Sequence, residues 1–447
     1  MVKIIEELKK FFFAKNILIV GLGVQGGGVG LAKFFSKLGA HVVITDLRSE
    51  EVLKDSVKEL DGFNCEYYFG SHPQEIFLRT DYIFIGPSVR WDLPPLLSAI
   101  KKGIPVEMET SFFIKYCPAK IIGVTGTRGK STVATMIYDI LKQQKKSVFL
   151  GGNFSGSSTI ELLEKVNKES IVVLELSSWQ LSSLHRKKIS PSIAVFTNLY
   201  PDHLNYYSSL DDYFYDKKAI YQYQMPGDYL IVNRQLEKKL KKDLPKSHLI
   251  YFTKNDFLGR LKYLKGEHNL ENAAAALVLA NVLKLNTEKA QQTIADFRGV
   301  NYRQETVGKK NQVIFVNDTT STTPVSTMKA IDSFCDKPIF LILGGNDKNL
   351  PVDELFQQLN KVKKIVLLKG TFTNKIYNHL LKNFSEKISP IFGNLDEAVK
   401  FAYQQAVKEP QENYLLFSPG ATSFSMFKNE FDRGQTFNLT VKRILSK

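Results

Sequence analysis

The sequence has little cysteine and no long hydrophobic run, and both shortages narrow the class of protein. Its 447 residues contain only three cysteines, Cys65, Cys117 and Cys335, which lie far apart. Because these cysteines are odd in number and scattered, they exclude a disulfide framework and a zinc site made of four cysteines. They fit a protein of a reducing compartment. No apolar run reaches the roughly 18 residues of a membrane span, and the first residues lack a signal-peptide cleavage region. We therefore expect a cytoplasmic protein without membrane insertion.

The charge of the chain is positive, since 60 lysines and arginines face 45 aspartates and glutamates, a formal net charge of +15. A basic surface can attract nucleic acid, anionic lipid or phosphorylated ligands. Here the lysines are spread along the chain, with acidic residues between many of them. We therefore expect ordinary solvated faces and no nucleic-acid partner, with the net charge at most helping anionic small molecules to arrive.

Short apolar runs alternate with helical stretches along the chain, which is typical of α/β layers with mainly parallel sheets. At roughly 150 residues per domain, the length suggests about three domains. Three α/β domains in series are therefore predicted, covering residues 1–107, 108–300 and 301–447. The expected strands are 16–21, 41–46 and 82–88 in the first domain, 121–127, 147–152, 171–178 and 193–199 in the second, and 313–318, 338–345, 364–370 and 413–420 in the third.

The first glycine-rich loop runs from Gly21 to Gly26 (GLGVQG), after a predicted strand and before a helix. Asp46 follows Gly26 after 20 residues, at the end of the next predicted strand. This spacing fits a dinucleotide site, in which the glycines admit a pyrophosphate to the helix N-terminus and the acid binds a ribose hydroxyl. A turn that binds nothing, or a nucleotide diphosphate other than NAD, stays open on this motif alone.

The second glycine-rich loop, Gly126–Thr132 (GTRGKST), is more specific. Its backbone amides can cradle phosphates, Lys130 can neutralise the terminal phosphates, and the Ser131 hydroxyl can bind Mg²⁺. The motif is a shortened form, because Val124 stands where a glycine is expected. A strand before it and a helix after it complete the context, so the sequence predicts an ATP site.

Polar residues also follow two further strands of the central domain. Glu175 ends one of them, and Asp202-His203 lies just beyond another. A carboxylate at a strand end suits a Mg²⁺ ligand, and His203 is predicted to join it. The alternatives are a capping or surface glutamate and a packed or solvated histidine. Lys217 has no distinguishing spacing, and composition alone suggests a solvated helix charge.

Seven sequence segments and their order along the chain are informative about the family: TGTRGKST, LELSSWQL, NLYPDHLNYY, GEHNLENAAAA, NDTTSTTP, LGGNDK and SPGATSFSMFKNEFDRG. Together they resemble the Mur ligase family over essentially the whole chain. The GTxGKST and EHN segments are shared with folylpolyglutamate synthetases, whereas LELSSWQL and SPGATSF resemble the D-glutamate-adding branch. The resemblance implies a Rossmann-like domain for a UDP-sugar, a P-loop ATPase-like central domain and a Rossmann-like C-terminal domain for the incoming amino acid.

The resemblance also implies an activity in peptidoglycan precursor synthesis. The expected reaction is ATP-dependent amide formation between UDP-N-acetylmuramoyl-L-alanine and D-glutamate through an acyl phosphate. It implies two Mg²⁺ sites, a CO₂-derived carbamate on Lys217, and a monomer.

Residue roles follow from the same resemblance. Lys130, Glu175, His203 and Lys217 are the expected catalytic residues, and Ser131, Glu175, His203 and carbamylated Lys217 the expected metal ligands. ATP would be bound by Gly126, Thr127, Arg128, Gly129, Lys130, Ser131, Thr132, Asn269, Asn272, Arg303 and Asp318. The UDP-substrate would be bound by Val24, Gln25, Asp46, Arg48, Asn153 and Gln180. D-glutamate would be bound by Thr322, Lys348, Ser423 and Phe424.

Four positions depart from the family pattern. Thr320 stands where many relatives have lysine, and Gly86-Pro-Ser88 replaces a Ser-Pro-Gly segment of the first domain. Arg128 occupies a phosphate-loop position that is often asparagine. The aromatic residue that covers glutamate in some relatives is either Phe424 or Phe431.

Three other functions stay open. The first is a Mur or folylpolyglutamate-type ligase for another amino acid. The second is an NAD-dependent dehydrogenase based on the first glycine loop, which leaves the second loop unexplained. The third is a non-catalytic nucleotide-binding or regulatory relative, which the departures at Thr320 and Ser88 would favour.

Overall fold

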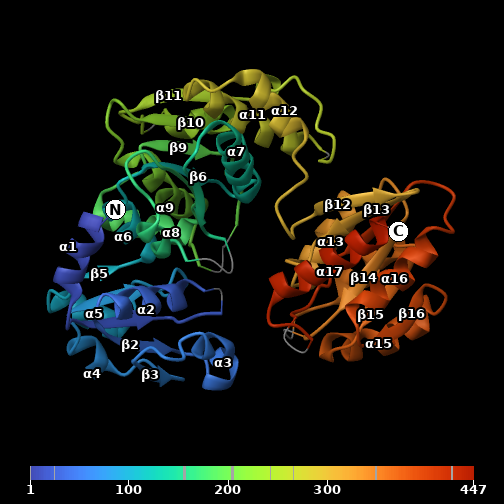
Figure 1. Ribbon diagram of the computed structural model, residues 1–447, viewed down its shortest axis with the longest axis horizontal. Coiled ribbons are helices and arrows are strands. Elements are labelled where there is room, and N and C mark those ends of the chain that lie inside the picture. Colours follow the sequence, from blue (N-terminus) through green and yellow to red (C-terminus); the bar gives the residue numbers. More distant parts are fainter. Residues whose placement is uncertain are drawn as a thin grey trace. The chain divides into compact units, whose positions relative to one another are not determined.

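The computed structural model describes residues 2–24, 26–154, 158–202, 206–241, 243–264, 266–347, 350–423 and 426–446. The chain forms two compact units, residues 1–260 with 266–295, and residues 261–265 with 296–447 (Figure 1). The first unit contains two sheets and the second unit contains one. The predicted boundaries after residues 107 and 300 stay predictions.

The first sheet has the order β3-β2-β1-β4-β5, and all its strand pairs are parallel. Strand β1 shows why this segment forms a central strand, because Ile17–Val20 is a continuous apolar run that is buried on both faces. The elements are α1 (Val2–Phe12), β1 (Asn16–Val20), α2 (Gly27–Lys37), β2 (His41–Asp46), α3 (Glu50–Lys58), β3 (Cys65–Phe69), α4 (Gln74–Leu78), β4 (Tyr82–Ile85), α5 (Pro94–Lys101) and β5 (Val106–Glu107).

The second sheet has the order β11-β10-β9-β6-β8-β7, again with parallel pairs. Its strands are β6 (Lys120–Thr125), β7 (Val148–Gly152), β8 (Ile171–Glu175), β9 (Ile193–Phe196), β10 (Tyr229–Asn233) and β11 (His248–Phe252). Its helices are α6 (Glu109–Tyr116), α7 (Lys130–Gln144), η1 (Ile160–Glu164), α8 (Ser178–Lys187), α9 (Leu210–Gln222), η2 (Arg234–Leu236), α10 (Glu237–Leu240), η3 (Lys254–Asp256), α11 (Glu267–Val282) and α12 (Thr287–Ala295).

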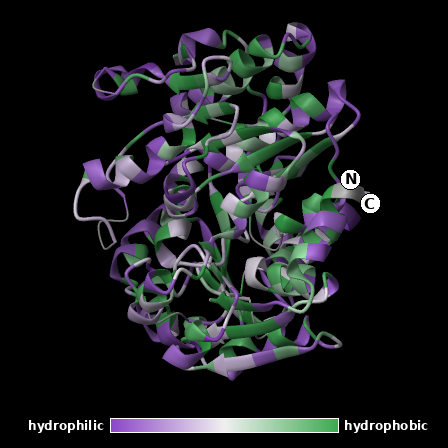
Figure 2. Ribbon diagram, turned by 90° about the vertical axis from the view of Figure 1, so that its left-hand side faces the viewer, coloured by the Kyte–Doolittle hydropathy of each residue, from purple (hydrophilic) through white to green (hydrophobic). Residues whose placement is uncertain are grey.

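A shared hydrophobic core joins the two sheets of the first unit. Phe112 of α6 lies in this core, with ring centroids 5.7 Å from Phe35 and 5.2 Å from Phe84. In Figure 2 the strand ribbons are predominantly hydrophobic, whereas hydrophilic residues are frequent on the outer helices and loops. Burial of aromatic rings at this joint stabilises the relative position of the two sheets within the unit.

The third sheet has the order β12-β13-β17-β14-β15-β16. Only its β12–β13 pair is antiparallel, and separate clusters of buried residues cover its two faces. The elements are β12 (Glu305–Lys310), β13 (Val313–Asn317), α13 (Pro324–Ser333), β14 (Ile339–Gly344), α14 (Asp353–Gln358), η4 (Leu359–Lys361), β15 (Lys364–Leu368), α15 (Thr371–Phe384), β16 (Ile388–Phe392), α16 (Leu395–Ala406), β17 (Asn413–Phe417) and α17 (Glu430–Leu445).

Three mainly parallel α/β sheets in series confirm the predicted fold class. Within the described part of the chain, no helix is both long and apolar enough to span a bilayer.

Candidate functional site

The phosphate loop joins the end of central strand β6 to α7. Gly126 has a φ of 148°, and a Cβ atom there would lie 1.9 Å from Thr197 Oγ1. Gly129 caps α7 with a φ of 78° and provides no side-chain cap. Only glycine fits the first position without displacing neighbouring atoms, and the second needs the left-handed backbone that glycine adopts freely. The sequence therefore folds into a tight loop, and its last glycine provides no side-chain cap for α7.

The residues after β9 hold this loop in place. Asn198 accepts hydrogen bonds from Thr127 N at its carbonyl (2.9 Å) and from Arg128 N at its side chain (2.8 Å). Thr197 Oγ1 donates to the carbonyl of Arg128 (2.6 Å). These bonds fix two amides of the loop to the neighbouring strand. Asn198 was not among the predicted site residues, although its place directly after a strand was a usable signal.

Lys130 and Ser131 lie at the start of α7. Lys130 Nζ donates to the carbonyl of Thr127 at 3.0 Å, so the ammonium group lies over its own loop. Ser131 is buried, and Thr132 is partly buried beside it. The structure thus brings a cation and a hydroxyl to the N-terminus of a helix, an arrangement that can bind phosphate.

Glu175 lies at the end of β8, next to β6. Its side chain is 3% exposed, and Oε1 accepts a hydrogen bond from Asn153 Nδ2 at 3.2 Å. The second oxygen, Oε2, is buried and has no hydrogen-bond partner among the described residues. A buried carboxylate oxygen without a donor is costly, so this atom is suited to a bound cation.

Lys217 of α9 is fully buried and lies against the phosphate loop. It is therefore not the solvated helix charge that composition alone suggests. Its Nζ donates to the carbonyl of Gly126 at 2.8 Å. Burial, and next the charge of Lys130, lower the pKa of Lys217 well below its usual value, although Asp202, Glu175 and Asp216 oppose the shift. The lysine is therefore held toward its neutral, nucleophilic form.

Helix α11 covers the other side of the loop. Asn272 donates to Asn269 Oδ1 at 3.2 Å, and its own Oδ1 lies 2.2 Å from where a Cβ atom on Gly129 would be. Asn272 thus packs on the phosphate loop itself.

His203 lies outside the described residues, and in the described ranges no three His, Cys, Asp or Glu side chains form a ready metal site.

The first glycine loop forms one wall of a cavity of about 330 Å³ within the first unit. Asp46 lies beneath this loop, accepting hydrogen bonds from Gly23 N (3.1 Å) and from Arg48 Nε and Nη2 (3.0 and 2.9 Å). Burial alone would raise the pKa of Asp46, but the bonds from Arg48 and Gly23 outweigh it, and the pKa is lowered. Asp46 therefore supports the loop through Oδ2, whereas Oδ1 binds only Arg48. Gln25 lies outside the described residues.

The opposite wall of the cavity comes from the second sheet and its helices. It includes Asn153 and Gln180, two of the predicted substrate residues, together with Trp179. Gln180 also accepts a hydrogen bond from Ser177 N at 3.0 Å, in the capping box of α8. Val24 and Arg48 line the same cavity, so the structure brings together five of the six predicted residues either on its walls or directly beneath them.

In the second unit, Asp318 follows β13 and is 1% exposed. It accepts hydrogen bonds from Ser321 Oγ (2.6 Å), Ser418 Oγ (2.7 Å) and Gln304 N (3.1 Å). Burial raises the pKa of Asp318 to about 6, and the three bonds and the charge of Arg303 only partly oppose it.

Ser423 and Arg433 line a small cavity in the same unit. The Ser423 Oγ is buried without a hydrogen-bond partner among the described residues. Arg433, which the sequence did not single out, is 1% exposed and donates to Thr319 Oγ1 (2.9 Å) and to the carbonyls of Thr319 (2.8 Å) and Ala421 (3.0 Å). Arg433 thus connects the segment before Thr322 to the segment before Ser423.

Lys348 and Phe424 lie outside the described residues, and Phe431 packs edge-on against Tyr302.

Comparison with known proteins agrees with this arrangement. Residues 15–107 match the N-terminal domain model of MurD-like Mur ligases, and residues 124–263 match the Mur ligase middle domain. UDP-N-acetylmuramoylalanine–D-glutamate ligase of Borreliella afzelii (strain PKo) is 35% identical over 98% of this chain and 99% of its own length. The ligase of the same name from Clostridium tetani is 31% identical, covering 99% of this chain and all of its own length.

The fold is similar to that of a solved relative. UDP-N-acetylmuramate–alanine ligase from Thermotoga maritima superposes with a TM-score of 0.55 at 20% identity, covering 97% of this chain and 99% of that chain. The family models and the curated relatives together extend over nearly every element described above. The chain therefore belongs to the Mur ligase family.

Proposed function

We infer that the protein is an ATP-dependent, ADP-forming ligase that joins D-glutamate to UDP-N-acetylmuramoyl-L-alanine in peptidoglycan precursor synthesis. The observation that carries this inference is the whole-length similarity to relatives named UDP-N-acetylmuramoylalanine–D-glutamate ligase. The phosphate loop and the buried carboxylate beside it supply the chemistry that such a reaction needs. Only small-molecule substrates are required, and we propose that a monomer in the cytoplasm carries out the reaction.

The ATP phosphates are proposed to lie on the Gly126–Thr132 loop. The close approach of Thr197 to Gly126 and the uncapped N-terminus of α7 are the features that support this placement. Lys130 would contact the terminal phosphates, and Asn269 and Asn272 would lie at the nucleotide beside the loop. Arg303 and Asp318 are proposed to contact the nucleotide from the second unit.

Mur ligases use Mg²⁺, and the residues here fit such an ion. The Glu175 Oε2 atom is a buried oxygen without a donor, beside the Ser131 hydroxyl's loop and the neutral Lys217 amine. We propose Ser131, Glu175, His203 and Lys217 as ligands of two ions. Bound Mg²⁺ would neutralise phosphate charge and polarise the bond to the leaving ADP.

Lys217 is proposed to be carbamylated. A neutral amine attacks CO₂ through its lone pair and then loses one proton, which converts a cation-forming group into an anion. The lowered pKa of Lys217 favours the neutral form that this step needs. The product would present two oxygens, the ligand type that Mg²⁺ prefers.

The reaction itself has two steps. A carboxylate oxygen of the L-alanyl group attacks the γ-phosphorus of ATP, and ADP leaves, which yields an acyl phosphate. The amine of D-glutamate then attacks the acyl carbon, and the tetrahedral intermediate loses a proton and expels phosphate. The first step brings two anions together, so the cationic groups near the loop matter most, and losing one such contact costs about 100-fold or more in rate. Thr322, Lys348, Ser423 and Phe424 are proposed to bind D-glutamate.

Phosphate release with ATP and UDP-N-acetylmuramoyl-L-alanine tests the proposal. We expect release to depend on D-glutamate, and not to be supported by L-alanine, diaminopimelate or lysine. A preference for one of those amino acids would assign the protein to another ligase of the family. NADH binding, or nucleotide binding without substrate-dependent hydrolysis, would contradict the ligase assignment altogether.

Variants in the same assay test the residue roles. Lys130→Ala and Glu175→Ala should abolish turnover while the far-ultraviolet circular dichroism stays unchanged. Lys217→Ala should also be inactive, whereas Lys218→Ala, which loses an ion pair with Asp243 and a cation–π contact with Tyr215, should retain activity. Removal of bicarbonate should slow the wild-type protein if Lys217 is carbamylated, and an unchanged rate would contradict the carbamate.

A further inference from the structure

A carboxyl group lies on the wall of the 330 Å³ cavity, where the sequence predicted none. It belongs to Glu109, the first residue of α6. Glu109 Oε1 accepts hydrogen bonds from Ser158 Oγ (2.5 Å) and from Ile160 N (2.9 Å), at the start of η1. Oε2 lies 3.6 Å from the position that a Cβ atom on Gly27 would occupy.

Gly27 is the first residue of α2, so Glu109 lies at the N-terminus of the helix that follows the first glycine loop. The cap of α2, Gly26, has a φ of 91° and offers no side-chain oxygen to the first amides of the helix. Such a helix end attracts an anion, and a diphosphate in this cavity would lie against it. An ionised Glu109 would then be close to a second anion, which is unfavourable.

The surroundings of Glu109 favour its neutral form. Burial raises the pKa of Glu109, and the nearby charge of Glu161 acts in the same direction, although bonds from Ser158, Ile160 and Thr159 oppose them. Nearby cations have other partners: Arg48 on the cavity wall pairs with Asp46, and on α2 Lys33 pairs with Glu59 and Lys37 with Glu164. A neutral carboxyl differs from an ionised one in a useful way, because it can donate a hydrogen bond as well as accept one.

We propose that Glu109 binds the diphosphate of the UDP-substrate as a neutral acid, with the Oε2 hydroxyl donating a hydrogen bond to a phosphoryl oxygen, so that substrate binding takes up one proton wherever the free carboxyl is ionised. The proposal rests on the proposed function, which places the UDP-substrate in this cavity. The bond between the proton and the acid form of the buffer breaks as the Glu109 Oε2–H bond forms, the conjugate base of the buffer stays in solution, and no bond between heavy atoms changes. Glu109 is thus a binding residue that couples the affinity for substrate to pH.

The proposed proton uptake predicts how strongly the Kd for the substrate changes with pH. When the pH exceeds the pKa of the free carboxyl, each further unit leaves about tenfold less protein in the neutral form, so the Kd for the substrate rises about tenfold per unit. The diphosphate of the substrate is esterified at both ends, and the alanyl carboxyl has a pKa of about 3.5. Neither titrates near neutral pH, so a proton taken up on binding belongs to the protein.

Isothermal titration calorimetry can count this proton. UDP-N-acetylmuramoyl-L-alanine is titrated into the protein in two buffers of different ionisation enthalpy, and the difference between the two binding enthalpies gives the number of protons taken up. For the wild-type protein we expect an uptake that approaches one proton per site, together with a rising Kd, as the pH is raised above the pKa of the free carboxyl. Glu109→Gln supplies a permanent donor of the same size, so the uptake should vanish and the Kd should become independent of pH. Glu161→Gln is the matched control, since its charge is adjacent but outside the proposed bond, and it should keep the uptake.

The outcomes separate this proposal from the proposed function. If the wild-type protein does not bind the UDP-substrate, the proposed function itself fails. If it binds with no proton uptake and a Kd that is flat with pH, or if Glu109→Gln retains the uptake, the role of Glu109 is wrong and the ligase assignment stands. Should Glu109→Gln fold poorly, the wild-type proton count still decides.

Discussion

Two pairs of helices in this protein begin in opposite ways. Helices α2 and α7 follow the glycine loops, and their caps, Gly26 and Gly129, are left-handed glycines without a side-chain bond to the helix. Helices α16 and α17 begin with Asn394 and Asn429, whose Oδ1 atoms each accept two backbone amides of the first turn. The first pair leaves amides for a ligand, and the second pair satisfies them within the chain.

The difference shows how the chain separates binding from stability. A glycine cap contributes no bond of its own, so the loops before α2 and α7 need support from elsewhere. Asp46 provides it for the first loop through Gly23, and Asn198 provides it for the second through Thr127 and Arg128. Each loop is therefore held by a polar side chain at the end of a neighbouring strand.

Gly126→Ala should have the largest effect, because it closes the phosphate loop. The added Cβ atom would lie 1.9 Å from Thr197 Oγ1 and 3.0 Å from Asn198 N, at a φ of 148°. We expect kcat/KM for ATP to fall by about 100-fold or more, since the donors would no longer meet the phosphates. Gly227→Ala is the control, because nothing lies within 4 Å of that position. Equal activity of the two variants would show that ATP does not use this loop.

Asn198→Ala should have a smaller effect on the same loop. It removes the Oδ1 acceptor of the Arg128 amide and the Nδ2 donor to the Arg128 carbonyl (3.1 Å), but leaves the backbone carbonyl that binds Thr127 N. The loss of these two side-chain bonds costs about 1–2 kcal/mol, or roughly tenfold in the KM for ATP. Steady-state kinetics at saturating UDP-substrate measure it. An unchanged KM would mean that the loop keeps its shape without the clamp.

Asp46→Asn should weaken ligand binding at the first glycine loop about as much as Asn198→Ala weakens it at the second. It should leave the second loop unchanged. It loses the ion pair with Arg48 and one acceptor for Gly23 N. We expect the Kd for the UDP-substrate to rise about tenfold, with the KM for ATP unchanged. Because the pKa of Asp46 is lowered, its contribution is complete above about pH 4 and is lost only as the pH falls below that value. Asp46 therefore adds no pH dependence near neutrality, in contrast to Glu109.

Much of this arrangement could be predicted from the sequence, because apolar runs mark buried strands and polar residues follow them. The runs at 171–175 and 193–196 became β8 and β9, and Glu175 lies where a strand-end residue should lie. The edge strands β3, β12 and β16 were missed, since partly exposed strands such as ETVGKK carry little apolar signal. Strand β10 (YLIVN) carried a clear signal and was overlooked.

The side-chain environments could not be predicted from composition or spacing. Lys217 stands between Asp216 and Lys218 in a polar stretch, and only tertiary packing buries it against Gly126. Glu109 and Arg433 gain their importance in the same way, because Ser158 lies 49 residues from Glu109 and Thr319 lies 114 residues from Arg433. The family resemblance supplied the role of Lys217, and no such signal existed for Glu109.

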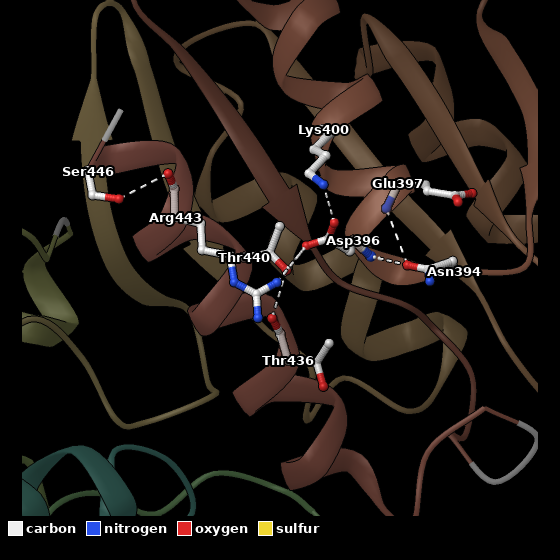
Figure 3. A network of polar contacts seen from close by, with 8 residues as sticks. All are labelled: Asn394, Asp396, Glu397, Lys400, Thr436, Thr440, Arg443 and Ser446. Atoms are coloured by element: carbon white, nitrogen blue, oxygen red, sulfur yellow. Dashed lines mark hydrogen bonds and ion pairs between the residues drawn. The ribbon is translucent and has the colours of Figure 1, made fainter.

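Asn394→Ala should have the smallest effect and should spare activity, because this cap serves stability alone. Asn394 Oδ1 accepts the amides of Asp396 (2.8 Å) and Glu397 (3.4 Å), and Asp396 in turn accepts Thr440 Oγ1 at 2.8 Å, which links α16 to α17 (Figure 3). We expect a loss of about 1 kcal/mol in the free energy of unfolding, seen as a lower urea midpoint.

Asn394→Ser is the matched variant, since serine caps nearly as well as asparagine and should restore most of that loss. Both variants should keep the wild-type kcat and the KM for ATP. A drop in activity with Asn394→Ala would place α16 in the binding machinery and remove the contrast between the two kinds of helix start. An unchanged urea midpoint would instead mean that water replaces the cap, so that the asparagine contributes nothing that the glycines of α2 and α7 lack.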